Sequence, residues 1–420
     1  MSRVVEIVYP VCCGIDVHKS FIVACIAVTD KYSHTEHHIR RFSTFTGDLR
    51  RLADWLASYN CRDVCMESSG KYWIPVFNML EKTCNVCLTH PKYVKAIKGK
   101  KTDKKDAKWI SELFKCDLVR SSFIPPPDIG QLRDLCRYYI KLTSFISSEK
   151  NRAQNCLTMC NFKLDDVFTD VFGKSATRVL DALLEHGNGN FELDGLLSAK
   201  CKSSPEQVRA ALEGELDLMQ AEKLSLIRQH INDINSLKAS LENLIYNLAV
   251  KYQPKIDLLM TVPGISTQLS AIRILAEIGA DMSVFETAKQ LTSWAGLTPQ
   301  NQESAGKKKT TRIGRAGAYL KPLLVQIALN CGKSDKCPEL KNKYLSLKKR
   351  RGGKKAVIAI ARKLLTAIWH ILSKNEVYNA ELYRKSDKPP VTRVLTTAQA
   401  VAFLSSKGFL IVDKETGEVA

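Results

Sequence analysis

Short apolar runs and helical periodicities alternate along the first third of the chain. Runs rich in Val, Ile, Cys and Ala predict strands, and apolar residues spaced by three or four predict helices. The predicted strands are 12–17, 21–29, 38–45, 63–67 and 85–89. The predicted helices cover 49–56, with Thr46 or Asp48 as the cap, then 73–80, and then a segment from Thr102 or Asp103 to Phe114.

The resulting order of elements, β-β-β-α-β-α-β-α, is that of the ribonuclease-H-like (RuvC-like) α/β fold. In this strand order the first and fourth strands are neighbours in the sheet. We expect residues 10–127 to form such a domain, which Pro125-Pro126-Pro127 closes.

The rest of the pattern is helical, so the fold class is α/β plus all-α. In the part 128–252, apolar residues between Leu224 and Leu248 step by three and four. That stripe fits a coiled coil or an oligomerisation helix, and it fits an ordinary amphipathic bundle helix equally well. The part 253–375 is predicted to be a mostly helical domain, in which Pro263-Gly264-Ile265 between two helices resembles a helix-hairpin-helix element. The pattern of 376–420 indicates only an appendage.

Composition narrows the class of protein. The 420 residues include 63 Lys and Arg against 43 Asp and Glu, a net charge of +20, and 45% are hydrophobic. The apolar share excludes a disordered basic tail, and the charge indicates a polyanionic partner. There is no run of 18 apolar residues and no signal-peptide layout, so we expect a soluble, cytoplasmic and nucleoid-associated protein.

The fourteen cysteines are scattered along the chain. In a long cytoplasmic chain we expect small buried hydrophobes rather than disulfides. Cys84 and Cys87 have C-x-x-C spacing, but no second pair of ligands follows at a zinc-finger distance. Strand packing is therefore the expected role of this pair.

Four carboxylates fall where the predicted sheet would bring them together. Asp16 ends the first strand, Glu67 ends the neighbouring fourth strand, and Asp103 and Asp106 share one face at a helix start. Singly, a capping or solvated role is favoured for each acid. Together they favour a site for Mg²⁺, because clustered like charges need a cation and Mg²⁺ prefers oxygen ligands. Lysines that could contact phosphate flank the helix start: Lys100, Lys101, Lys104 and Lys105.

A second group of candidate residues surrounds Ser304, in a segment predicted to be a loop. A serine hydroxyl needs a base or a metal to become a nucleophile, and this loop offers neither. From chemistry alone, a loop or capping role is favoured for Ser304, and phosphate binding for the cations after it. Those cations are Lys307, Lys308, Lys309, Arg312 and Arg315, and a further basic cluster is Lys348, Lys349, Arg350 and Arg351.

Motifs in both halves of the chain resemble those of one protein family. Gly14–Lys19, Met66–Gly70 and Lys101–Ala107 resemble the acidic motifs of the DEDD insertion-sequence transposases, the IS-one-ten family, which includes the Piv-like invertases. A second set of motifs resembles the C-terminal transposase (Tnp) domain of that family: Pro263–Ile265, Ala295–Pro299, Ser304–Gly306 and Gly314–Leu320. The motifs occur in the family's order, between about residues 10 and 375.

The resemblance implies that Asp16, Glu67, Asp103 and Asp106 bind Mg²⁺ while Ser304 attacks a DNA phosphate. It also implies a homo-oligomer, a dimer assembling to a tetramer, and a bridge (guide) RNA that pairs with donor and target DNA. We therefore predict an RNA-guided transposase or recombinase that cuts and rejoins DNA through a phosphoserine intermediate. Two alternatives are kept: a hydrolytic RuvC-like junction nuclease, and a non-enzymatic nucleic-acid-binding protein.

Overall fold

The computed structural model describes residues 6–68, 70–94, 102–187, 191–199, 201–300, 302–304, 307–310, 312–314, 316–383, 396–412 and 416–417. The chain divides into two compact units, Met1–Leu248 (unit 1) and Ala249–Ala420 (unit 2). The four-part division expected from the sequence stays a prediction.

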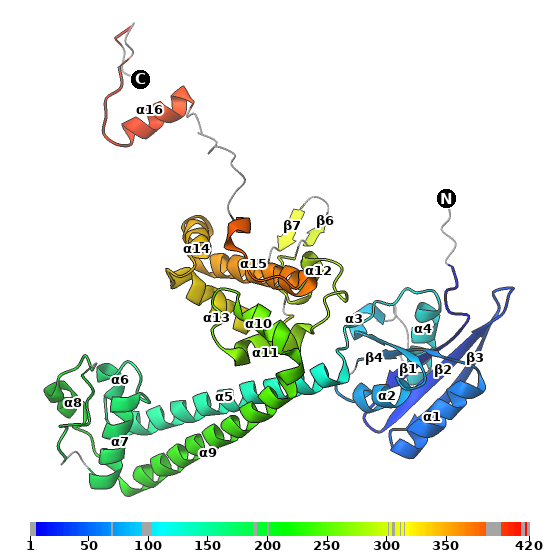
Figure 1. Cartoon of the computed structure of the whole chain (residues 1–420), viewed down its shortest axis with the longest axis horizontal. Coiled ribbons are helices and arrows are strands. Elements are labelled where there is room, and N and C mark those ends of the chain that lie inside the picture. Colours follow the sequence, from blue (N-terminus) through cyan, green and yellow to red (C-terminus); the bar gives the residue numbers. More distant parts are fainter. Residues whose placement is uncertain are drawn as a thin grey trace. The chain divides into compact units, whose positions relative to one another are not determined.

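Unit 1 begins with a mixed five-stranded sheet (Figure 1). Its strands are β1 (Val11–Val17), β2 (Phe21–Thr29), β3 (Thr35–Ser43), β4 (Asp63–Glu67) and β5 (Asn85–Thr89), and its helices are α1 (Thr46–Ser58), α2 (Trp73–Leu80), α3 (Pro91–Val94) and α4 (Asp103–Lys115). The strand order is β3-β2-β1-β4-β5, with β1 antiparallel to β2 and parallel to β4. The predicted α/β order of elements, with the first and fourth strands adjacent, is confirmed, and the sheet is mixed.

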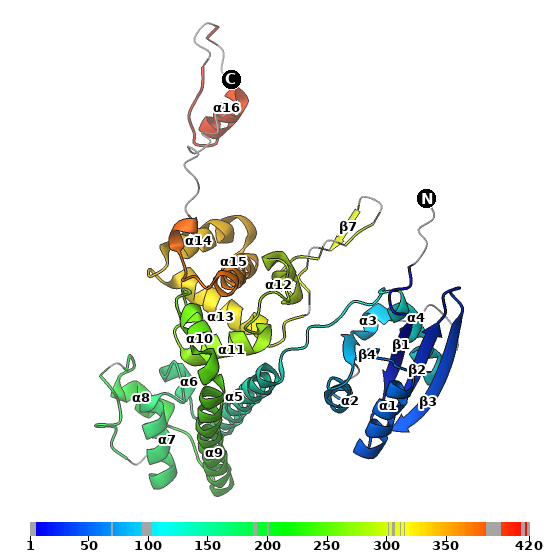
Figure 2. The same cartoon turned by 45° about the vertical axis from the view of Figure 1, so that its right-hand side comes forward.

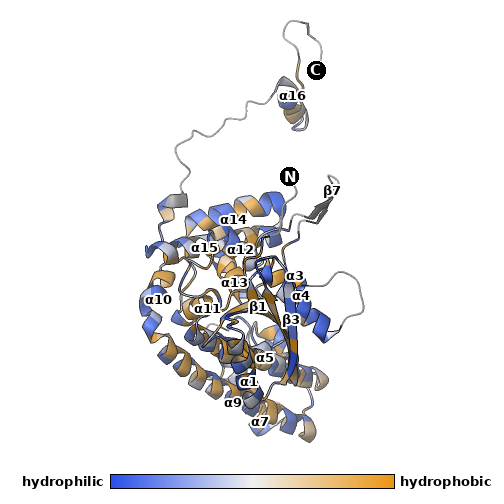
Figure 3. Ribbon diagram, turned by 90° about the vertical axis from the view of Figure 1, so that its right-hand side faces the viewer, coloured by the Kyte–Doolittle hydropathy of each residue, from blue (hydrophilic) through white to orange (hydrophobic). Residues whose placement is uncertain are grey.

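Strand alternation gives the sheet two different faces. In β1, Cys13, Ile15 and Val17 pack in the core that contains α1 and α2. The alternate residue Cys12 packs with Ile110 and Phe114 of α4, so the even-numbered side of β1 faces that helix. Figure 3 shows β1 as hydrophobic, in keeping with its burial, and the edge strand β3 as largely hydrophilic.

Two local predictions in this domain were wrong. The third strand was expected at 38–45, but β3 begins at Thr35, which pairs with Thr29 of β2. Neither Thr46 nor Asp48 caps α1, because Phe45 occupies the N-cap position. The Asp48 carboxylate instead accepts hydrogen bonds from the backbone and hydroxyl of Ser43.

The remainder of unit 1 is helical. Its helices are α5 (Pro127–Met159), α6 (Leu164–Val167), α7 (Lys174–His186), α8 (Pro205–Ala211) and α9 (Leu218–Ala249). The two long helices α5 and α9 run side by side in Figures 1 and 2. His230 lies 3.2 Å from Glu149, and Lys238 lies over the ring of Tyr139, so the pair is antiparallel. The short helices α6, α7 and α8 form a separate core with the C-terminal end of α5 and the N-terminal end of α9. A coiled-coil assembly stays a prediction.

Unit 2 is mostly helical and packs around one long central helix, α15. Its elements are η1 (Val250–Tyr252), α10 (Gln253–Met260), α11 (Gln268–Ile278), α12 (Ala288–Trp294), β6 (Gln302–Ser304), β7 (Lys307–Thr310), α13 (Leu320–Lys333), α14 (Pro338–Arg351), α15 (Gly353–Lys374), η2 (Ala380–Tyr383) and α16 (Thr397–Ser405). Gly279 ends α11 with φ +83°, a conformation that glycine adopts readily. The turn Pro263-Gly264-Ile265 does join two helices, α10 and α11, but a helix-hairpin-helix role stays a prediction.

The segment around Ser304, expected to be a loop, is a two-stranded antiparallel hairpin of β6 and β7. Of the described residues, only α15 is long and apolar enough to cross a membrane by length and composition. Half of its apolar window is buried, and its buried face consists of core side chains that include Ile360, Leu364 and Ile368. All fourteen cysteines are free thiols, and Cys87 lies in β5 in register with Cys65 of β4.

Candidate active site

Asp16 lies at the centre of the candidate site, near the carboxyl end of β1. Because side chains alternate along a strand, Asp16 shares the α4 face of the sheet with Gly14 and Cys12. Its side chain is buried, with the residue only 8% exposed. A buried carboxylate without a counter-charge is costly, so its surroundings decide what it can do.

Glu67 is brought beside Asp16 by the parallel pairing of β1 with β4. The register pairs Ile15 with Met66, so the next residue of each strand is the acid. Glu67 also alternates with Met66 and therefore lies on the same face as Cys65, which packs against α4. The two acids thus end neighbouring parallel strands on the face that α4 covers.

The other two acids come from the first turn of α4. Thr102 is the N-cap of this helix, and its hydroxyl accepts a hydrogen bond from the backbone N–H of Lys105. Asp103 and Asp106 occupy the first turn, where carboxylates are favoured by the partial positive charge of the helix N-terminus. The packing of α4 against β1 therefore carries both aspartates toward Asp16.

The other three acids act electrostatically on Asp16. Burial raises the pKa of the Asp16 carboxyl, His18 lowers it, and the negative charges of Glu67, Asp106 and Asp103 each raise it. A carboxylate crowded by three like charges is stabilised by a bound cation. The structure thus brings the four predicted acids together, and their role as ligands stays a prediction.

His18 is a further residue of the site that was not among the predicted ligands. Its Nε2 atom lies 3.2 Å from Oδ2 of Asp16 and 3.4 Å from Oδ1 of Asp103. The three potential ligand atoms lie within 4.8 Å of one another. The spacing of two residues between His18 and Asp16 is only a partial signal, because β1 ends at Val17 and the approach of His18 to Asp103 depends on how α4 packs.

The donor set fits a divalent cation. The Nε2 atom of His18 is shielded from solvent and has no hydrogen bond of good geometry, although two carboxylate oxygens lie close to it. A buried nitrogen without a hydrogen bond, enclosed by carboxylates, is suited to coordination. Oxygen donors suit Mg²⁺ and Mn²⁺, and the imidazole nitrogen extends the range toward transition metals.

We predict that His18→Ala weakens binding of Mn²⁺ by about tenfold or more, because it removes one of three clustered ligand atoms. Titration of the metal-free protein with Mn²⁺, followed by electron paramagnetic resonance of the free ion, measures this. The matched control is His34→Ala, since His34 also faces a carboxylate, 3.6 Å from Asp30, but is exposed. Equal Mn²⁺ affinities of the two variants would contradict a ligand role for His18.

The structure describes the side chains of only some of the predicted phosphate-binding residues. Lys104 and Lys105 are exposed on α4, beside the acids. The basic cluster Lys348 to Arg351 forms the exposed last turn of α14, where cations also stabilise a helix C-terminus. Arg312 is exposed after β7. Lys100, Lys101 and Arg315 lie outside the described residues, as do the side chains of Ser304, Lys307, Lys308 and Lys309.

Two family models match the chain, in order. A model described as "Transposase", for the DEDD domain of IS110 elements, matches residues 13–162, which include all four acids. A model described as "Transposase IS116/IS110/IS902 family" matches residues 256–345, which include Ser304. The chain belongs to the IS110 (IS-one-ten) family of transposases. The resemblance found in the sequence motifs is thereby confirmed.

Individual relatives agree with this family. The transposase for insertion sequence element IS1111A of Coxiella burnetii is 31% identical over 125 residues, 28% of this chain and 33% of the relative. The pilin gene-inverting protein of Moraxella bovis is 30% identical over 167 residues, 37% of this chain and 48% of the relative. The chain thus matches between a third and about half the length of these relatives.

Among solved structures, the Fowlpox virus resolvase in complex with Holliday junction DNA matches with 18% identity and a TM-score of 0.18. The match covers 25% of this chain and 72% of the resolvase chain. A TM-score this low does not bear on the fold or the function. The fold of the N-terminal domain follows from its sheet topology, and the family follows from the two family models.

Proposed function

We propose that this IS110-family chain is a DNA recombinase that cuts and rejoins strands to move an insertion sequence. The observation that carries the proposal is the acid cluster. Three carboxylates, Glu67 of β4 and Asp103 and Asp106 of α4, act electrostatically on the buried Asp16 of β1, within a segment that matches the family's DEDD domain. Such a cluster is suited to phosphodiester chemistry, in which negative charge builds up on phosphate oxygens.

In this proposal the N-terminal domain is RuvC-like, and Asp16, Glu67, Asp103 and Asp106, together with His18, hold divalent cations. Mg²⁺ bound there would polarise a phosphate oxygen and stabilise the developing charge. The protein's own part is to fix the ligands. Asp16 and Glu67 are held by paired strands, and the two aspartates of α4 by a capped helix end. The exposed Lys104 and Lys105 are placed to bind the flanking phosphates.

Ser304 is the proposed nucleophile. Its hydroxyl oxygen forms a bond to phosphorus while one P–O bond of the DNA strand breaks, and the leaving oxygen departs as a hydroxyl group. The energy of the phosphodiester is kept in the phosphoserine, so attack by another hydroxyl rejoins the strand and releases the serine. The support is its position at the end of β6, inside the segment 256–345 that matches the family's second domain.

The proposed partners are donor DNA, target DNA and a bridge RNA, with the protein acting at the nucleoid of the cytoplasm. The net charge of +20 supports binding to nucleic acids. A homo-oligomer, a dimer that assembles to a tetramer, is supported by α9. Leu226, Leu237 and Leu244 lie on one face of that helix and are more than half exposed.

The proposal is tested by looking for a covalent protein–DNA adduct. Purified protein is incubated with Mg²⁺, labelled element-end DNA and the element's non-coding RNA, and the products are separated under denaturing conditions. We expect an adduct with wild-type protein and none with Ser304→Ala or Asp16→Ala, because one change removes the nucleophile and the other a metal ligand. Omitting the RNA should abolish the adduct if the RNA guides the reaction.

The other outcomes identify the alternatives. Free cleaved ends that persist with Ser304→Ala would support a hydrolytic junction nuclease, in which a water molecule replaces the serine. Tight DNA binding without cleavage by wild-type protein, unchanged in Asp16→Ala, would support a non-enzymatic binding protein. Either result would overturn the phosphoserine mechanism.

A further inference from the structure

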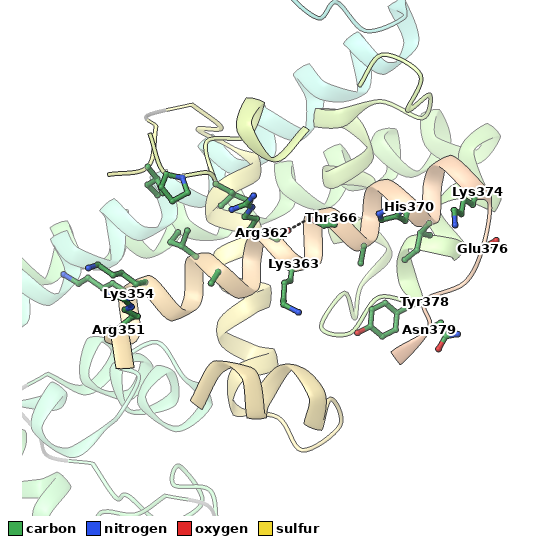
Figure 4. A pocket seen from close by; sticks show the side chains of 18 of the residues that line it. Arg351, Lys354, Arg362, Lys363, Thr366, His370, Lys374, Glu376, Tyr378 and Asn379 are labelled. Carbon is green, nitrogen blue, oxygen red and sulfur yellow. Dashed lines mark hydrogen bonds between the residues drawn. The ribbon is translucent and has the colours of Figure 1, made fainter. Parts of the chain in front are cut away.

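Unit 2 contains a large pocket along α15 that the proposed reaction does not use. Its volume is about 1590 Å³, larger than the roughly 300–1,000 Å³ of usual small-molecule sites. Figure 4 shows its side chains distributed along the whole helix. The occupant should therefore be an extended ligand rather than a compact metabolite.

The lining residues of α15 form one continuous helical face. They recur in pairs every four positions: Lys354, Lys355, Ile358, Ala359, Arg362, Lys363, Thr366, Ala367, His370, Ile371 and Lys374. At 1.5 Å per residue this face is about 30 Å long. Small side chains, Ala359, Thr366 and Ala367, alternate with cations along it, so a ligand backbone can approach the helix closely.

The pocket is strongly basic. Seven of its lining residues are Lys or Arg, including Arg312 and Arg351, whereas Glu376 is its one acid. Burial lowers the pKa of the Lys363 ammonium, and the nearby charge of Lys343 lowers it further. Cations that crowd one another in this way are stabilised by a polyanion.

The floor of the pocket is apolar, and this distinguishes between polyanions. Leu297, Pro299, Ile313, Ile358 and Ile371 line it among the cations. A duplex presents phosphates outward and buries its bases, so it would leave this floor uncovered. A single strand presents both parts, with phosphates for the cations and base faces for the apolar surface. A concave pocket also does not match a flat anionic membrane.

One wall of the pocket is the base of the hairpin that carries Ser304. Pro299 and Ile313 form a β-bridge there, and the backbone N–H of Gln300 donates to the carbonyl of Arg312 at 3.0 Å. A ligand seated on α15 would therefore pass the two strands that lead to Ser304. This continuity links the pocket to the proposed reaction.

We infer that the α15 pocket binds a single-stranded segment of nucleic acid, with the phosphates on the cations and the bases on the apolar floor. The inference rests on the proposed function for its biological setting, since it would hold a displaced DNA strand or an unpaired RNA segment beside the nucleophile. Beyond the proposed reaction, it assigns a binding site that prefers single-stranded to double-stranded nucleic acid. Both DNA and RNA share this chemistry, so the test includes both.

The test measures binding without catalysis, using full-length protein in EDTA. Fluorescence anisotropy compares labelled oligo-dT and oligo-U of about 16 nucleotides with a duplex of the same length, at several salt concentrations. We expect Arg362→Gln/Lys363→Gln to weaken single-strand binding about tenfold and to lower its salt slope by about 1.4, since two phosphate contacts are lost. Duplex binding should change less than twofold.

The matched control is Lys333→Gln/Lys336→Gln, which removes the same charge from exposed positions in unit 2 outside the pocket. A third variant, Ala367→Glu, places an anion on the face and should weaken single-strand binding without removing a cation. Photocrosslinking of oligonucleotides with 4-thiothymidine or 4-thiouridine should label peptides within 351–379. The base that crosslinks better identifies DNA or RNA as the ligand.

Three results would overturn the inference: equal losses in the pocket and control variants, equal losses for duplex and single strand, or binding to acidic phospholipid vesicles in place of oligonucleotides. Because no metal or cleavage is involved, a missing DNA adduct would refute the proposed reaction and leave this measurement unaffected. Conversely, adduct formation without single-strand binding at α15 would refute the pocket alone.

Discussion

Asp16→Asn should abolish DNA cleavage and joining, with a loss of about 1,000-fold or more in rate. Asparagine keeps the size of the side chain but removes the charge at the centre of the acid cluster. The remaining acids come from other elements and cannot occupy the same position at the end of β1. Single-turnover assays with element-end DNA at saturating Mg²⁺ measure the rate.

The same substitution should make the metal-free protein more stable, which separates a lost ligand from a lost fold. The pKa of Asp16 is raised in the folded state, by burial and by Glu67, Asp106 and Asp103, with His18 opposing. A raised pKa means that the unfolded chain releases this proton more readily, so the ionised carboxylate destabilises the fold at neutral pH. Removing the charge relieves that cost. In EDTA the melting temperature of the variant should exceed that of wild type.

Added Mg²⁺ should raise the melting temperature of wild type and have a smaller effect on Asp16→Asn, because ligand binding stabilises only the state that binds. The control is Asp54→Asn, an exposed carboxylate of α1, which covers the other face of the sheet. It should keep both the activity and the response to Mg²⁺. Cleavage by Asp16→Asn at the wild-type rate would exclude Asp16 from the reaction.

The sheet was predictable because its strands are short apolar runs separated by polar turns. The predicted bounds of β2, β4 and β5 are those observed. The start of β3 was not predictable in this way, because Thr35 to His37 are polar residues of an edge strand. They are held by backbone pairing with β2 rather than by burial. The N-cap of α1 was also not predictable from residue type alone. Asp48 accepts a hydrogen bond from the hydroxyl of Ser43 in the preceding turn instead of capping the helix.

The convergence of the acids could be inferred because adjacency of β1 and β4 follows from the order of elements. The participation of His18 depends on tertiary geometry, in which α4 brings Asp103 to the residue after β1. The hairpin β6–β7 gave no signal, because consecutive lysines have neither apolar alternation nor high strand propensity. The α15 pocket likewise arises only when segments before β6, after β7 and after α15 meet on one helix.

Gly14→Ala should damage the site without touching any of its ligands. A Cβ atom at Gly14 would lie 2.4 Å from the carbonyl oxygen of Ala107 and 2.4 Å from the backbone nitrogen of Ser111. Both atoms belong to the backbone of α4, so the helix itself must move away from β1. Overpacking of this kind costs about 1–3 kcal/mol, and backbone contacts place the cost at the upper end. Urea unfolding of unit 1 and hydrogen exchange of α4 amides measure the loss.

Displacing α4 also displaces Asp103 and Asp106, which its first turn carries, so Mn²⁺ affinity should fall by about tenfold together with cleavage. Gly47→Ala is the matched control, because Gly47 lies in α1 with no atom within 4 Å of an added Cβ. In that helix alanine should leave stability unchanged or raise it by up to about 1 kcal/mol. Wild-type metal affinity in a destabilised Gly14→Ala protein would show that close packing of α4 on β1 does not position the aspartates.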